Sequence, residues 1–281
     1  MSTFKTFETA WCPGCGNFGI LNSIKIALEE LDKDPYEVLM VAGIGQAAKT
    51  PQYLSANNFC GLHGRALPAA AAAKIANNEL TVIVDSGDGD SYGEGGNHFI
   101  HNIRRNVNIT HLVHDNQIYG LTKGQASPTT SEGQITEVQT SGSINTPLNP
   151  IMMALAAGAG FVARAFSGDP EQLVKIIKEA IEYPGYAYVD ILQPCVTFNK
   201  INTYAYYKSK VYHLPEDYDF TNRAKAFELE LNLSEKIPTG IIYKENKPNY
   251  HDKQMILKTG EPLINKKNDK KVLEKLIHEF V

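Results

Sequence analysis

The chain of 281 residues has few cysteines and no surplus of positive charge. Lys and Arg total 27 against 31 Asp and Glu, so the formal net charge is -4 at pH 7. A nucleic-acid partner is not expected, because proteins that neutralise phosphates are usually basic. Only four cysteines in a chain this long exclude a small disulfide-stabilised fold and favour metal-binding or catalytic thiols.

Long hydrophobic runs are also missing. The longest uncharged stretch, 138–163, is interrupted by Pro147 and Pro150, so it falls short of the ~20 apolar residues that span a bilayer. Residues 1–11 lack the basic start and apolar run of a signal peptide. We therefore expect a cytoplasmic protein without a membrane segment. Hydrophobic residues make up 43%, enough for one large or two small domains.

Apolar runs and helical patterns alternate along the first 198 residues. The runs lack polar alternation, as is typical of strands covered on both faces. This order predicts an α/β fold with a mostly parallel sheet flanked by helices, whose ligands bind beyond the carboxyl ends of the strands. Strands are expected at 38–42, 80–84, 109–113 and 186–192, and helices at 17–32, 65–76, 96–105, 152–159 and 170–182.

The composition changes after Pro194, where Lys, Tyr and Asn become more frequent. We expect residues 1–198 to form the main domain. Residues 199–281 are expected to be a C-terminal extension that wraps around this domain or a partner, because their apolar content is thin for a separate core. Within the extension, the pattern predicts a helix at 219–231, a strand at 237–243 and a helix at 269–280.

An acidic, glycine-rich turn, Asp85-Ser-Gly-Asp-Gly-Asp90, follows the strand expected at 80–84. Glycines let the backbone approach a ligand closely, but carboxylates repel a phosphate unless a divalent cation lies between them. Asn116 follows the next strand, 28 residues beyond Asp88. A right-handed crossover would place the two strand ends side by side, where Asp88, Asn116 and a carbonyl could share Mg²⁺.

Other interpretations of this turn are weaker. A tight acidic turn without a ligand remains open. A calcium loop starting at Asp88 would put Tyr92 and Phe99 where oxygen ligands are required. A dinucleotide turn would leave the pyrophosphate facing unshielded acids.

The sequence GDGDSYGEGGNHFIHNIRRN, followed by DNQIYGLTKGQASPTT, resembles the thiamine-diphosphate-binding (beta) subunits of 2-oxoacid:ferredoxin oxidoreductases. WCPGCGNFG, GIGQAAKTPQY, LHGRALP and ILQPCVTFN match further family blocks in the same order, so the resemblance covers residues 11–200. It implies the thiamine-diphosphate-binding fold, with Mg²⁺ held by Asp88, Asn116 and the main chain of Ile118. The remaining residues that it places at the cofactor are Gly87, Gly89, Asp90, Gly120, Leu121 and Thr122.

The four cysteines could form a redox site, a zinc site or an iron–sulfur site. Cys12-Pro-Gly-Cys15 has the spacing of a thioredoxin redox site, but that fold needs a strand upstream of the motif. A zinc site that includes His63 is chemically possible. The resemblance instead implies a [4Fe–4S] cluster on Cys12, Cys15 and Cys195, with Gln46 where the family has its fourth cysteine. Cys60 could replace that ligand, or it could be an ordinary small buried residue.

The resemblance also implies the reaction: oxidative decarboxylation of a 2-oxoacid to acyl-CoA and CO₂, with electrons passed through the cluster to ferredoxin. Lys49 and Lys123 are candidates to bind the substrate carboxylate, although both could be solvated loop lysines. His63 and Arg65 are further candidates for catalysis, through the diphosphate or the substrate. Leu121 could support the cofactor.

An alpha-type partner subunit is expected to carry the Glu that activates the aminopyrimidine and the coenzyme A site, because this chain has room for one α/β layer only. Two alternatives remain. One is a thiamine-dependent decarboxylase or acyl-transfer subunit without a cluster, and the other is a non-enzymatic scaffold subunit that binds zinc or iron.

Overall fold

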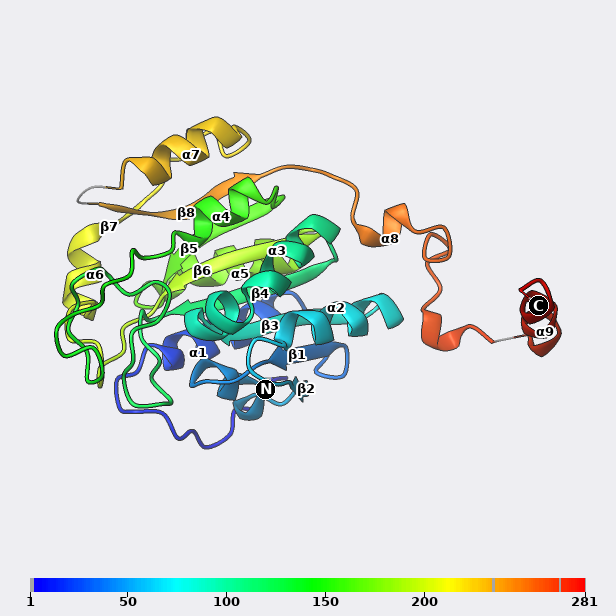
Figure 1. Ribbon diagram of the computed structural model, residues 1–281, viewed down its shortest axis with the longest axis horizontal. Coiled ribbons are helices and arrows are strands. Elements are labelled where there is room, and N and C mark those ends of the chain that lie inside the picture. The colour runs from blue at the N-terminus through cyan, green and yellow to red at the C-terminus, as the bar shows by residue number, and fades with distance from the viewer. Residues whose placement is uncertain (1–2, 234–235, 268, 281) are drawn as a thin grey trace.

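An eight-stranded, mostly parallel sheet runs through the protein, with helices on both faces (Figure 1). The computed structural model describes residues 3–233, 236–267 and 269–280. The spatial order of the strands is β2-β1-β3-β4-β6-β5-β8-β7, and the β5–β8 pair is antiparallel. The strands are β1 (Val38–Ala42), β2 (Asn57–Cys60), β3 (Thr81–Gly87), β4 (Ile109–Asp115), β5 (Phe161–Phe166), β6 (Tyr186–Leu192), β7 (Val211–His213) and β8 (Ile237–Lys244).

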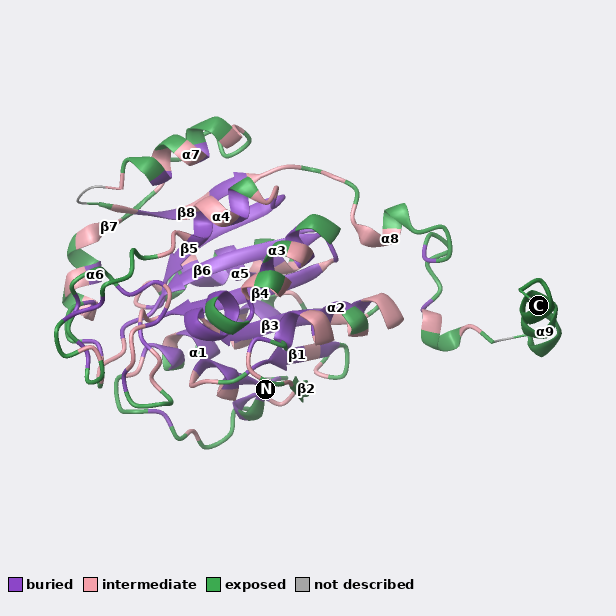
Figure 2. Cartoon of the chain, in the orientation of Figure 1, coloured by how far each residue is buried: buried purple, intermediate pink, exposed green. Residues whose placement is uncertain are grey.

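The central strands are buried on both faces, as their unbroken apolar sequences predict (Figure 2). The predicted α/β fold and mostly parallel sheet are confirmed, and the bounds of β1 and β6 match those expected. β3 and β4 run further than expected and end at Gly87 and Asp115. Since these last residues are polar or small, an apolar pattern could not mark them as strand.

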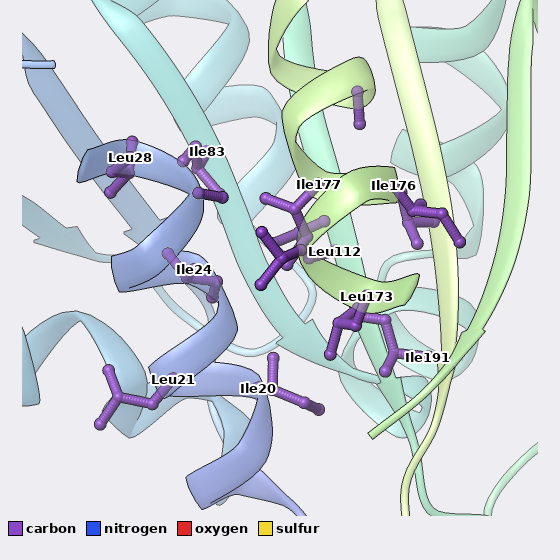
Figure 3. Packing of buried hydrophobic residues seen from close by; sticks show 14 of the residues in the cluster. Ile20, Leu21, Ile24, Leu28, Ile83, Leu112, Leu173, Ile176, Ile177 and Ile191 are labelled. Atoms are coloured by element: carbon purple, nitrogen blue, oxygen red, sulfur yellow. The ribbon is translucent and has the colours of Figure 1, made fainter. Parts of the chain in front are cut away.

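Two helical layers cover the sheet. α1 and α5 lie on one face, where Ile24 and Leu28 of α1 and Ile177 of α5 join Ile83 and Leu112 of the strands in one buried cluster (Figure 3). Burying a side chain of this size contributes roughly 1.5–3 kcal/mol. The other face carries α2, α3, α4 and α7. The helices are α1 (Asn17–Glu30), α2 (Ala66–Ala76), α3 (Gly96–Arg105), α4 (Pro150–Ala156), α5 (Pro170–Glu182), α6 (Tyr204–Lys210), α7 (Arg223–Leu231), α8 (Tyr250–Lys253) and α9 (Lys270–His278), with short turns η1 (Ala47–Tyr53), η2 (Gly89–Glu94) and η3 (Leu263–Asn265).

Two predicted helix starts were wrong because capping residues decide them. α4 begins at Pro150 rather than 152, since the Asn149 side chain accepts a hydrogen bond from the Met152 amide. α7 begins at Arg223 rather than 219, because Asn222 caps it in the same way. The Asp219 carboxylate accepts a hydrogen bond from the Thr221 amide at 3.1 Å, which makes a turn there.

Residues after 198 contribute strands to the sheet. β8 pairs with β5, and β7 pairs with β8 in parallel. The chain then leaves the sheet through α8 and η3, and α9 lies apart from the body with an exposed surface (Figures 1 and 2). None of the helices in the described parts of the chain is long and apolar enough to cross a membrane.

Candidate active site

A hollow lies at the carboxyl ends of β3 and β4. These strands are parallel neighbours with Gly87 opposite His114, so the turns after them emerge side by side. The predicted juxtaposition of Asp88 and Asn116 follows from this register. The lining residues are Ile44, Gly45, Gln46, Ala47, His63, Gly87, Asp88, Gly89, Asp90, Asn116, Ile118, Tyr119, Gly120, Leu121 and Thr122. Every residue that the sequence placed at the cofactor is therefore in this wall.

Asp88 is held from the far side by the loop between β4 and α4. Its Oδ2 accepts hydrogen bonds from the hydroxyls of Ser127, at 2.5 Å, and Thr129, at 2.7 Å. Asp88 is buried. These hydroxyls fix the rotamer of the carboxylate at the wall of the hollow.

A second buried carboxylate, Asp115, shares the Thr129 hydroxyl, whose Oγ1 lies 2.8 Å from Asp115 Oδ1. Burial raises the pKa of both Asp88 and Asp115, and repulsion from Asp190 and then from Asp88 adds to the increase for Asp115. A hydroxyl has one hydrogen and cannot donate to both carboxylates at once. The pair consequently favours a cation beside it, and carboxylate plus amide oxygens are a donor set that fits Mg²⁺.

The turn that carries Asn116 is fixed by its own side chain and by the C-terminal part of the chain. Asn116 Oδ1 accepts a hydrogen bond from the Ile118 amide at 2.9 Å, and Gln117 adopts a left-handed φ of 58°. The Asn199 side chain donates to the Asn116 carbonyl at 3.0 Å. This bracing fixes Asn116 in the wall of the hollow that Asp88 also lines.

Asp90 organises the opposite wall. Its Oδ1 accepts hydrogen bonds from the amides of Ile44, at 2.9 Å, and Gly64, at 2.8 Å, and lies 2.9 Å from His63 Nδ1. Burial raises the pKa of Asp90, although these donors oppose the shift. Asp90 thus joins two loops and orients His63 into the hollow.

Gly89 is required by a close approach of Tyr119. A Cβ at position 89 would lie 2.2 Å from the Tyr119 ring, so a larger residue would push the ring away. The Tyr119 hydroxyl lies 3.2 Å from Glu94 Oε2, and burial raises the pKa of this tyrosine. The hydroxyl is therefore neutral and able to donate.

The proposed catalytic residues are not all in the hollow. His63 lines it, with 37% of its side chain exposed. Lys49, Arg65 and Lys123 do not line it. Arg65 is exposed, and its guanidinium lies 2.7 Å from His98 Nε2. Lys123 is exposed in a left-handed turn with φ 80°.

A second hollow contains three of the four cysteines. Cys12, Cys15 and Cys195 line it, whereas Cys60 is exposed at the end of the edge strand β2 and does not. Burial raises the pKa of the Cys15 thiol to about 11. No three His, Cys, Asp or Glu side chains within the described ranges form a group that could hold a single metal ion.

Gln46, Asn116 and Gly120 line both hollows and so form their common wall. The main-chain carbonyl of Gln46 accepts a hydrogen bond from Trp11 Nε1 at 2.9 Å, which ties the cysteine loop to this wall. The two sites are therefore immediate neighbours.

Sequence reasoning missed the residues that support the site rather than line it. Ser127 and Thr129 lie within the segment QASPTT, where hydroxyl residues beside Pro128 were the available signal. Gln46 was noticed as a departure from a cysteine pattern, but its place in both walls depends on the fold. Asn199 carried no local signal.

The fold and this site define a class of protein. Residues 38–191 match the family model for the thiamine pyrophosphate enzyme, C-terminal TPP binding domain. Residues 195–259 match the model for the C-terminal part of the pyruvate ferredoxin oxidoreductase beta subunit. The chain is a thiamine pyrophosphate enzyme domain of this type.

Curated relatives narrow the family. The 2-oxoacid:ferredoxin oxidoreductase 2, subunit beta, of Aeropyrum pernix is 45% identical over 244 residues, which is 83% of this chain and 79% of that protein. The 2-oxoacid:ferredoxin oxidoreductase subunit beta of Saccharolobus solfataricus is 44% identical over 257 residues, covering 87% of this chain and 84% of the relative. The chain belongs to the beta subunits of the 2-oxoacid:ferredoxin oxidoreductases, and the resemblance read from its motifs is confirmed.

A solved structure supports the same assignment. The 2-oxoglutarate:ferredoxin oxidoreductase from Magnetococcus marinus, with 2-oxoglutarate, coenzyme A and succinyl-CoA bound, is similar with a TM-score of 0.90 and 40% identity. The similarity covers 96% of this chain and 92% of that one.

Proposed function

We propose that this chain is the thiamine-diphosphate- and Mg²⁺-binding subunit of a CoA-acylating 2-oxoacid:ferredoxin oxidoreductase. The observation that carries the proposal is the pair of neighbouring hollows, one with Asp88 and Asn116 at adjacent strand ends and one with three cysteines. Family membership supports the reaction class, and the geometry supports the choice of residues.

Asp88, the Asn116 amide oxygen and the main chain of Ile118 would hold Mg²⁺, which in turn would bind the diphosphate. Gly87 and Gly120 leave the backbone open to the cofactor, whereas Gly89 makes room for the Tyr119 ring, and the apolar side chain of Leu121 lines the hollow and is 40% exposed. When bound, thiamine diphosphate supplies an electron sink for decarboxylation.

Other residues of this wall position and shield the reactants. His63, whose Nδ1 lies 2.9 Å from Asp90 Oδ1, lines the hollow and can form a hydrogen bond with a reactant there. The Tyr119 hydroxyl donates to Glu94 on the same side, so its ring contributes to the wall of the hollow. Lys49, Arg65 and Lys123 lie outside the hollow, so any contact with substrate would require loop movement or the partner.

The proposed partner is an alpha-type subunit that supplies the Glu for the aminopyrimidine and the coenzyme A site. The beta-subunit names of the relatives imply such a partner, and ferredoxin is the implied electron acceptor. The three thiols beside the cofactor hollow would hold an iron–sulfur cluster that carries the electrons away.

Calorimetric titration of the reconstituted heteromer with thiamine diphosphate and Mg²⁺ tests the proposal. Asp88→Asn should weaken binding at least tenfold, because a cation ligand is lost, while Asp217→Asn, at an exposed surface position, should leave it unchanged. Reduction of ferredoxin should require the 2-oxoacid, coenzyme A and both subunits. Unaltered binding by the Asp88→Asn variant, or full turnover by this chain alone, would refute the assignment.

A further inference from the structure

The cysteine hollow presents three thiols and one carboxamide. Cys12, Cys15 and Cys195 come from the loop before α1 and the segment after β6, and Gln46 comes from the loop after β1. Three thiols in one hollow, without a group suited to a single ion, fit an iron–sulfur cluster better than zinc. Such a cluster normally takes a fourth thiolate.

Cys60 is not placed to supply that fourth thiolate. It lies at the end of β2, which is the outer strand of the sheet, and all four residues of β2 are exposed. Its sulfur lies 3.9 Å from Gln52 Nε2, a residue that lines neither hollow. Moving Cys60 into the cysteine hollow would require β2 to leave β1.

Gln46, by contrast, has an oxygen available. Its Oε1 is buried and has no hydrogen-bond partner among the residues that the structure describes, while its main chain is held by Trp11. A Cβ on Gly120 would lie 3.8 Å from Gln46 Cγ, so the side chain runs along the wall shared with the cofactor hollow. A buried acceptor without a partner destabilises the folded chain, and a bound metal ion would remove that penalty.

We propose that the cluster is bound by the thiolates of Cys12, Cys15 and Cys195, and that its fourth iron is bound by the amide oxygen of Gln46. The inference rests on the proposed function for the presence of a cluster. A neutral oxygen donor binds iron more weakly than an anionic thiolate. One iron of the four therefore differs from the others in its electronic environment and is held less tightly.

Mössbauer spectroscopy of the heteromer, reconstituted without oxygen with ⁵⁷Fe and sulfide, tests this ligand set. The wild-type cluster should show one iron that is distinct from the other three. Gln46→Cys should make the four irons alike, and Gln46→Ala should change or remove the distinct signal. Cys60→Ser is the matched thiol control and should keep both the iron content and the wild-type spectrum, whereas Cys195→Ser should lose iron.

Four alike irons in the wild type, iron loss in Cys60→Ser, or an unchanged distinct signal in Gln46→Ala would each overturn the proposal. Absence of iron uptake in a heteromer that still binds thiamine diphosphate would overturn it as well, and would favour a decarboxylase without a cluster. Failure to bind thiamine diphosphate is a different result, because it contradicts the proposed function itself.

Discussion

Replacing Thr129 by Val tests whether the loop after β4 prepares the cation site. The Thr129 hydroxyl lies 2.7 Å from Asp88 Oδ2 and 2.8 Å from Asp115 Oδ1, and the residue is 5% exposed. Val occupies nearly the same volume, so the change removes the hydroxyl without opening a cavity. Two buried carboxylates would then lose their shared hydrogen-bonding partner.

The expected effect is on cofactor affinity. Loss of a group that orients a metal ligand typically weakens metal binding 10- to 100-fold, which corresponds to about 1.4–2.8 kcal/mol. Calorimetric titration of the heteromer with thiamine diphosphate at fixed Mg²⁺ measures this loss directly. Increasing Mg²⁺ should partly restore binding, because the damaged step is cation capture.

Thr136→Val is the matched control. Thr136 is a buried threonine of the same loop, and its hydroxyl contacts Gln139 rather than the carboxylates. It should lower the melting temperature without changing affinity. If Thr129→Val and Thr136→Val bind the cofactor equally well, the hydroxyl of Thr129 does not orient Asp88 and the reasoning fails.

Three further outcomes follow from burial. Burial raises the pKa of Asp190 to about 6, so the stability that its neutral form contributes is complete below the unfolded pKa of ~3.9 and is lost as pH rises through about 6. Asp190→Asn should therefore flatten the dependence of the melting temperature on pH over this window. An unchanged slope would contradict the raised pKa of Asp190. Burial raises the pKa of the Cys15 thiol to about 11, so little of the reactive thiolate is present at pH 8. In protein without iron, iodoacetamide should label Cys15 at least tenfold more slowly than the exposed Cys60. Equal labelling of the two cysteines, measured by mass spectrometry, would show that Cys15 is not protected. Leu112 lies in the core beneath α1 and α5, so Leu112→Ala should lower the free energy of unfolding by about 2–5 kcal/mol in a denaturant titration. Leu231 is exposed, and Leu231→Ala should lower the free energy of unfolding by less than about 0.5 kcal/mol. Similar losses in the two variants would mean that Leu112 is not a core residue of this sheet.

The local amino-acid pattern was enough to predict much of the sheet. β1 and β6 could be bounded from their apolar runs, because a parallel strand buried on both faces has no polar alternation. β5 was missed, since Phe161–Phe166 includes Arg164, which the structure buries against Glu230 of α7 with nitrogen to oxygen distances of 2.8 Å. An arginine paired across such a sequence distance is invisible to local pattern.

β2 was missed for a different reason. Asn57–Cys60 is polar, short and exposed, and it is a strand only because its backbone pairs with β1. β7 is similar, with three residues paired to β8. Edge strands of this kind depend on a neighbour rather than on their own side chains.

The order of residues along the chain is enough to predict that acidic and amide oxygens follow consecutive buried strands, and hence that Asp88 and Asn116 meet at one edge of the sheet. That inference needed only strand order and crossover handedness. Which residues hydrogen-bond to Asp88 and Asn116 depends on the folded chain. Thr129, which binds Asp88, lies in the long loop after β4, and Asn199, which binds the Asn116 carbonyl, lies beyond β6. The tertiary structure also decided that Gln46 rather than Cys60 faces the other cysteines, since no spacing along the chain specifies which loops close over the same hollow.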